Sequence, residues 1–153
     1  MPDVFKEVMS QCAVVTGLSG LEMPAIIARL LAAMVENGDL EPARLDAVAE
    51  AVLRREEAAS TVLSDGVAFP HTRTDAMTRL RAAVGVSAQG LELNAPDGGR
   101  THIIVLALCP QSAENRCHIQ FMAALSRSLL REGIIQNFVG TKDADSVRRL
   151  LLS

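Results

Sequence analysis

Aromatic residues are scarce in this sequence of 153 residues. It contains no Trp and no Tyr, and its aromatic content of 3% consists of four Phe, although 49% of the residues are hydrophobic. The core must therefore be built mainly from aliphatic side chains. Aromatic side chains are the usual stacking platforms for bases, and a nucleic-acid-binding domain usually carries a basic patch. With few aromatics and a net charge of -3, we expect no nucleic-acid partner.

Cysteines and long apolar runs are scarce as well. The three Cys form no Cys-x-x-Cys pair, which argues against a disulfide framework and favours a reducing compartment. The N-terminus lacks the basic start and apolar run of a signal peptide. The longest apolar segment, PAIIARLLAAMV, is interrupted by Arg29 and is too short to span a bilayer. We therefore expect a cytoplasmic protein that does not insert into a membrane.

Strand and helix patterns alternate along the chain, which we interpret as a single domain over residues 1–153. Pro24 and Pro42 suit the first turns of helices. Apolar residues recur at helical spacing over 24–37, 42–57 and 113–130, with shorter pieces at 131–139 and 143–152. Strands are expected at 12–15, 67–69, 82–88 and 102–109. The alternation predicts an α/β fold with a small mixed, mainly parallel central sheet flanked by helices on both faces.

The stretch GVAFPHTRTD places His71 directly after Pro70 and a short apolar strand. Proline fixes its own φ angle and pushes Phe69 towards an extended conformation, so the chain leading to His71 is stiff. Imidazole is substantially neutral, and so nucleophilic, at cytoplasmic pH. His71 is therefore expected at the end of a strand, as a nucleophile, base or metal ligand. A structural histidine there would fit the pattern about equally well.

Other residues could take part in chemistry. In the helix expected at 113–130, His118 shares a face with apolar residues, so it fits a partly buried helix histidine as well as a site. His102 begins an apolar strand and is expected to be structural. Arg55 lies at the end of the second helix, where it could face solvent or the pocket of His71. Arg73 is a second candidate contact for an anion, although a surface position suits it better.

Cys117 precedes His118 and raises the prospect of a Cys/His nucleophile. Neighbouring residues on a helix point about 100° apart, so these two side chains would not bond each other. A pairing of Cys117 with His71 stays open. A zinc site built from His71, His118 and Cys117 is possible in principle, but no spacing supports it. We expect neither a metal nor a cofactor.

The stretch RREEAASTVLSDGVAFPHTRTD resembles the active-site signature of the type-2 enzyme IIA domains of the bacterial phosphoenolpyruvate-dependent phosphotransferase system. These are the fructose, mannitol and nitrogen-regulatory IIA proteins. The matching residues are Arg55-Glu56, Ser60-Thr61 and the run from Gly66 to His71. Further on, APDGGRTHIIVLALCP is similar to the family's Pro-Asp-Gly turn and central strand. CHIQFMAALSRSLL is similar to its helix with a second histidine, in matching order and spacing.

Three positions depart from the family pattern. Val62-Leu63-Ser64 replaces a frequent Gly-hydrophobic-Gly, which predicts a stiffer and bulkier loop near the pocket. Thr72 follows the active-site histidine where the family usually has a small residue, and His102 stands where an acidic or small residue is frequent. These changes leave the expected fold intact and bear on substrate class and rate.

The resemblance implies a role for each matching residue. His71 would be phosphorylated by the histidine phosphocarrier protein. His118 would form a hydrogen bond beside the phosphoryl group, and Arg55 would place a cation near it, without a metal. His71 would then pass the group to a IIB domain or hold it as a regulatory state. A lone IIA segment is typical of the nitrogen-regulatory type, which we prefer, and the Pro-Asp-Gly turn favours the fructose and nitrogen-regulatory group. The string His118-Ile119-Gln120 is similar to the mannitol type.

Two other functions stay open. The first is a non-phosphorylated protein-interaction module on the same fold, which the departures at 62–64 suggest. The presence of His71, His118 and Arg55 together argues against it, since a lapsed site has no reason to keep all three. The second is a small hydrolase with Cys117 as its nucleophile. Blocking the thiol would have to abolish any such activity.

Overall fold

A central sheet of five strands organises the chain in the computed structural model, which describes residues 3–112 and 115–153, without the side chains of 115–118. The strand order is β1-β4-β5-β2, and β3 also pairs with β5. Only the β4–β5 pair is antiparallel. The predicted mixed, mainly parallel sheet is therefore confirmed. The strands are β1 (Ala13–Val15), β2 (Val67–Ala68), β3 (His71–Thr74), β4 (Arg81–Leu91) and β5 (Thr101–Pro110).

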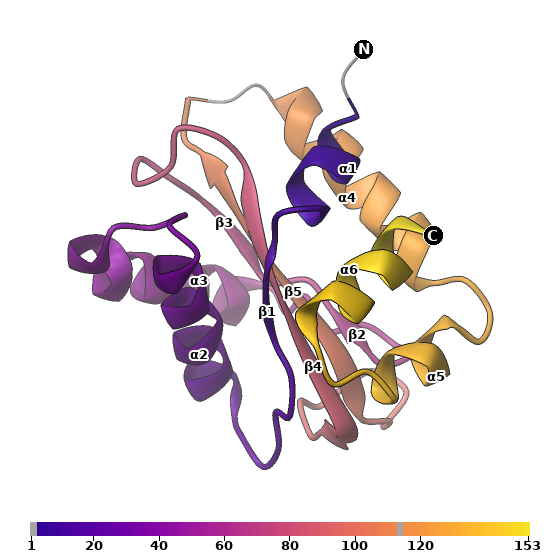
Figure 1. Cartoon of the computed structure of the whole chain (residues 1–153). Coiled ribbons are helices and arrows are strands. Elements are labelled where there is room, and N and C mark those ends of the chain that lie inside the picture. Colours follow the sequence, from indigo (N-terminus) through magenta and orange to yellow (C-terminus); the bar gives the residue numbers. More distant parts are fainter. Residues whose placement is uncertain (1–2, 113–114) are drawn as a thin grey trace.

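Helices cover both faces of the sheet, as predicted (Figure 1). On one face lie α2 (Met23–Glu36) and α3 (Leu45–Ala58), the latter preceded by a 3₁₀ turn at Pro42–Arg44. On the other lie α1 (Val4–Met9), α4 (Asn115–Leu129), α5 (Ile134–Val139) and α6 (Ala144–Leu152). None of the helices in the described part is long and apolar enough to cross a membrane.

The core consists of two apolar clusters, one on each face of the sheet. Successive side chains of a strand point to opposite faces. In β5, Ile103 and Val105 accordingly belong to the cluster under α1, α4, α5 and α6, whereas Ile104 and Leu106 belong to the cluster under α2 and α3. This two-sided burial explains why HIIVLALC is apolar along its whole length.

Helix α1 is one of two elements that the sequence pattern did not predict, the other being β3. It spans six residues, too few for a clear apolar period. Its N-cap is Asp3, whose Oδ1 accepts a hydrogen bond from the Lys6 backbone N–H at 3.1 Å. Val8 and Met9 are buried in the core cluster, so tertiary packing stabilises this short helix.

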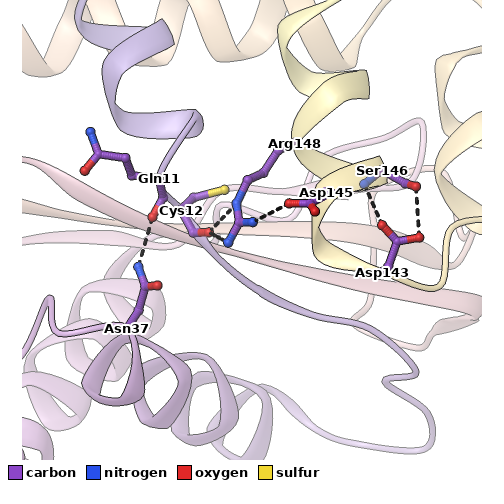
Figure 2. A network of polar contacts seen from close by, with 7 residues as sticks. All are labelled: Gln11, Cys12, Asn37, Asp143, Asp145, Ser146 and Arg148. Carbon is purple, nitrogen blue, oxygen red and sulfur yellow. Dashed lines mark hydrogen bonds and ion pairs between the residues drawn. The ribbon is translucent and has the colours of Figure 1, made fainter.

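The turn between α1 and β1 is held from both helical layers (Figure 2). From α6, Arg148 donates from Nε and Nη2 to the carbonyl oxygen of Cys12, at 3.0 and 2.7 Å. From the end of α2, Asn37 donates from Nδ2 to the carbonyl oxygen of Gln11 at 2.9 Å. Burial raises the pKa of the Cys12 thiol to about 11, so this sulfur stays protonated and unreactive near neutral pH.

Candidate functional site

Strands β2 and β3 both pair in parallel with the same side of β5, and the pairing register is the same for the two strands. Val67 pairs with Ile103 and His71 with Ala107, the same offset on either side of Pro70. The Pro70 carbonyl accepts a hydrogen bond from the Ala107 N–H at 3.0 Å. Proline has no N–H to donate, and an edge strand tolerates this loss because only one side of it must pair. The edge strand therefore continues through the proline.

His71 follows the end of β2, as expected, but it also begins β3, a strand that the sequence pattern did not predict. The residues that follow it continue the pairing with β5, and Thr72 and Thr74 are buried on the inner side of β3. Their β-branched side chains suit a strand, although HTRT reads as a polar loop. His71 is thus held by paired backbone on both sides of Pro70, and its ring is half-buried.

The hydrogen bond of the His71 ring defines its tautomer. Nδ1 lies 2.9 Å from the carbonyl oxygen of Phe69. A carbonyl oxygen can only accept, so Nδ1 carries the proton of the neutral ring and Nε2 carries the lone pair. The geometry accordingly makes Nε2 the nucleophilic nitrogen of His71.

A tight hairpin precedes the histidine and contains the departures at 62–64. Leu63 N–H donates to the Val67 carbonyl at 2.9 Å, and Phe69 N–H donates to the Thr61 carbonyl at 3.2 Å. The chain reverses at Asp65 and Gly66, which have φ angles of 68° and 83°. Val62 is buried in the core, so its bulk is taken up by packing, whereas the Leu63 side chain is exposed.

Glu56 connects the end of α3 to this hairpin. Its Oε2 accepts from the Thr61 backbone N–H at 2.8 Å, and its Oε1 accepts from the Thr61 hydroxyl at 2.5 Å. Ser60 Oγ accepts from the Val62 N–H at 3.1 Å. The Arg-Glu and Ser-Thr pairs are therefore joined by hydrogen bonds. The motif includes Glu56, but the sequence pattern did not predict this role. The available signal was a Thr five positions after the Glu at the end of a helix.

Arg55 is half-buried and donates from Nη1 to the carbonyl oxygen of Ala59 at 2.9 Å. The last carbonyls of a helix lack helical partners, so this bond helps to close the end of α3. Helix α3 packs against β3, the strand that His71 begins. A role of Arg55 as a cation beside His71 stays a prediction. Arg73 is exposed on β3, as a surface position requires.

His118 and Cys117 lie in α4, but their side chains fall outside the described residues. The predicted role of His118, the pairing of Cys117 with His71 and the zinc combination are therefore untested. Within the described part, no group of three or more His, Cys, Asp or Glu residues could hold a metal ion.

His102 is held in a different way from His71. Its Nδ1 lies 2.8 Å from the Ser87 carbonyl oxygen on the neighbouring strand β4. Gly66 and Gly90 leave room for the ring: a Cβ at these positions would lie 3.4 Å from His102 Cδ2 and 3.0 Å from Cε1. This bonded, closely packed ring fits the structural role expected for His102.

Residues 8–153 match the family described as the phosphoenolpyruvate-dependent sugar phosphotransferase system, EIIA 2. The chain therefore belongs to this family, as its motifs predicted. Its members are components of the phosphotransferase system, which supports a phosphotransfer role at this coarse level.

Relatives of both sugar-specific and regulatory kinds match the chain. A fructose-specific EIIA component of Haloferax volcanii is 32% identical over 106 residues, covering 69% of this chain and 68% of the relative. A nitrogen regulatory protein of Bradyrhizobium diazoefficiens is 25% identical over 105 residues, with the same coverage. The chain spans only 22% of a matching fructose-specific EIIABC component of Bacillus subtilis.

Solved structures of this family share the fold. The nitrogen regulatory protein IIA-Ntr of Neisseria meningitidis superimposes with a TM-score of 0.81 and 21% identity, covering 97% of this chain and 99% of that one. The IIA mannitol protein of Escherichia coli, solved in complex with phosphorylated enzyme IIB, gives a TM-score of 0.73 at 20% identity. This superposition covers 92% of the present chain and 94% of the mannitol protein.

Proposed function

We propose that this protein is a phosphocarrier that accepts a phosphoryl group on Nε2 of His71. The observation that carries the proposal is the place of His71 in the family's active-site signature, on the edge strand of the sheet. The bond from Nδ1 to the Phe69 carbonyl then indicates the accepting nitrogen, because it leaves the lone pair on Nε2. The donor would be the histidine phosphocarrier protein. The Nε2 lone pair forms the new bond to phosphorus while the bond to the donor's imidazole breaks and leaves its electron pair on the donor. The phosphorylated ring keeps its Nδ1 proton, which the Phe69 carbonyl continues to accept.

Transfer between two histidines is close to isoenergetic, so alignment and charge stabilisation are the main tasks of the protein. Paired backbone on both sides of Pro70 restricts the position of His71. Arg55 comes from α3, which packs against β3, and would supply positive charge near the equatorial oxygens. His118 would donate a hydrogen bond beside the phosphoryl group. No metal or cofactor takes part in this scheme.

The phosphoryl group would then pass to a IIB domain, or its presence would change which regulatory protein binds. Complex formation between a IIA mannitol protein and phosphorylated IIB supports the first partner class. The sequence-based preference for the nitrogen-regulatory type stays a prediction, because fructose-specific and nitrogen-regulatory relatives both match the chain.

The test is an intact-mass measurement after incubation with phosphoenolpyruvate, enzyme I and the histidine phosphocarrier protein. We expect one acid-labile phosphoryl group on the wild type and none on His71→Ala. A sugar-specific IIA protein in the same mixture controls for active donors. If that control is phosphorylated and the wild type is not, the proposal is wrong.

A second candidate is a protein-interaction module on the same fold in which His71 is not phosphorylated. It is supported by Leu63, which replaces part of a glycine-containing loop and is 38% exposed. The same assay separates the two: an unmodified wild type beside a phosphorylated control would favour the module. The next step would then be a search for proteins whose binding Leu63→Ser weakens.

A further inference from the structure

A polar cavity of about 310 Å³ lies beyond the end of β3 that is remote from His71. Its wall includes the loop that connects β3 to β4 and the segment that follows α2. Its volume is at the low end of the range for small-molecule sites. The lining residues are Gln11, Asn37, Gly38, Asp39, Ala76, Met77, Thr78, Arg79 and Arg81.

Arg81 is the unusual member of this lining, because its charged side chain is only 7% exposed. Its ion pair is with Asp39, and the Nε–Oδ1 distance of 3.7 Å is longer than a hydrogen bond. In the described part of the chain, the guanidinium donates no hydrogen bond to another residue. A guanidinium has five N–H donors, and none of the Arg81 nitrogens is among the fully buried side-chain atoms without a partner in the described part, so these donors keep access to the cavity. The cavity is where Arg81 can find acceptors.

Asp39 is held in place by a different partner. Its Oδ2 accepts from Asn37 Nδ2 at 2.8 Å, and the same nitrogen donates to the Gln11 carbonyl (Figure 2). Asp39 therefore cannot turn freely to close the gap to Arg81. The Asp39 carboxylate offsets one of the two arginine charges in the lining, so one net positive charge remains. This wall is set before any ligand binds, which lowers the cost of binding.

We propose that this cavity binds a small molecule through its carboxylate or phosphate group. The planar fork of Arg81 matches the paired oxygens of either group, and the exposed Arg79 lies at the same cavity to add a second contact. The volume exceeds that of a single oxyanion, so the ligand carries further atoms. A hydroxyl or amine on it would donate to Oδ1 of Asp39. This inference does not depend on phosphorylation of His71.

The experiment is an NMR titration of the isotope-labelled protein with inorganic phosphate and, separately, with acetate, each against sodium chloride at matched ionic strength. We expect saturable shifts in the amides of 37–39 and 76–81 and in the Nε–H signal of Arg81. Saturation by phosphate at lower concentration than acetate would identify a phosphate-bearing ligand, and the reverse order a carboxylate. Shifts that follow chloride, without saturation by either probe, would overturn the proposal.

Variants test whether Arg81 carries the binding. Arg81→Lys keeps the charge opposite Asp39 but loses the fork, and we expect binding at least about tenfold weaker, as for the loss of a charge-assisted hydrogen bond. The double variant Asp39→Asn with Arg81→Gln removes both charges together, so neither is left buried alone, and should abolish saturation. Arg54→Ala, on the exposed surface of α3, is the matched control and should bind as the wild type. Unchanged affinity in both Arg81 variants would contradict the inference.

Discussion

His71 and His102 make the same hydrogen bond in different surroundings. In each ring, Nδ1 donates to a backbone carbonyl oxygen: that of Phe69 at 2.9 Å for His71 and that of Ser87 at 2.8 Å for His102. Both rings therefore share one tautomer. His71 follows a proline and begins the edge strand β3. His102 lies on the central strand β5, and its ring packs beside Gly66 and Gly90. The comparison teaches that the tautomer alone does not identify a phosphoryl acceptor. Position in the sheet and the flanking motif must separate the two.

The largest expected effect is the loss of phosphorylation when one of these two histidines is replaced. His71→Gln should lose all phosphorylation, while His102→Gln should still gain one phosphoryl group, because only His71 lies in the family's active-site signature. Intact mass after incubation with the phosphoryl donors measures both. If His102→Gln lost the phosphoryl group and His71→Gln kept it, His102 would be the acceptor and the assignment to His71 would be wrong.

The next prediction concerns the packing around His102. Gly90→Ala combines a φ of +87° with a Cβ only 2.5 Å from Arg100 Cβ, so we expect destabilisation by about 3 kcal/mol or more. Gly98→Ala is the matched control, because its φ of +75° is similar but nothing lies within 4 Å of the new Cβ. Its cost should be about 1 kcal/mol. Urea unfolding measures both, and equal losses would contradict the crowding argument.

On the side of His71, the hairpin depends on Glu56. Glu56→Ala removes both acceptors of Thr61, whose N–H and hydroxyl then lose their partner, and should cost about 2 kcal/mol of unfolding free energy. Glu57→Ala changes the exposed neighbour and should stay within about 0.5 kcal/mol of the wild type. The same unfolding experiment compares them. A loss in Glu57→Ala as large as that in Glu56→Ala would show that the hydrogen bonds to Thr61 are not the cause.

The smallest expected effect is a pH dependence of stability that arises from Asp97, in the turn beside the hairpin. Hydrogen bonds from the backbone N–H groups of Gly99 and Asp65 hold the pKa of Asp97 below its ordinary value of 3.8. The folded state thus binds this proton less readily than the unfolded chain. The contribution to stability is present above pH 3.8 and is lost as pH falls through the lowered pKa.

Asp97→Asn should therefore be less stable than the wild type at neutral pH, by a small margin because the carboxylate is exposed. The difference should shrink below pH 4. Thermal unfolding across this range measures it. A difference that stays constant with pH would mean that charge on Asp97 plays no part.

Elements with strong local signals were predictable from the sequence. Pro24 lies in the first turn of α2, and the two-sided apolar run of β5 indicated a central strand. Helix α1 and strand β3 were not predictable in the same way. Helix α1 is short and is stabilised by packing. Strand β3 is a polar stretch whose extended conformation depends on its pairing with β5.

For the candidate site, the motif identified His71 and Arg55 as residues of interest but not their contacts. The Phe69 carbonyl that sets the tautomer of His71 lies only two residues away, yet its direction depends on how Pro70 joins the edge strand. The bonds from Glu56 to Thr61 likewise require the end of α3 to meet the hairpin. Such contacts depend on tertiary structure, which local spacing does not determine.

The proline in the edge strand also affects how this protein behaves at high concentration. An exposed strand edge invites pairing with another copy and hence aggregation. Here the hairpin segment around Val62 pairs with β2, and Pro70 withholds an N–H at the junction with β3. Beyond this junction the edge continues as the short strand β3, in which the charged side chain of Arg73 is exposed. The fold can thus present a histidine at a sheet edge without turning that edge into a template for self-association.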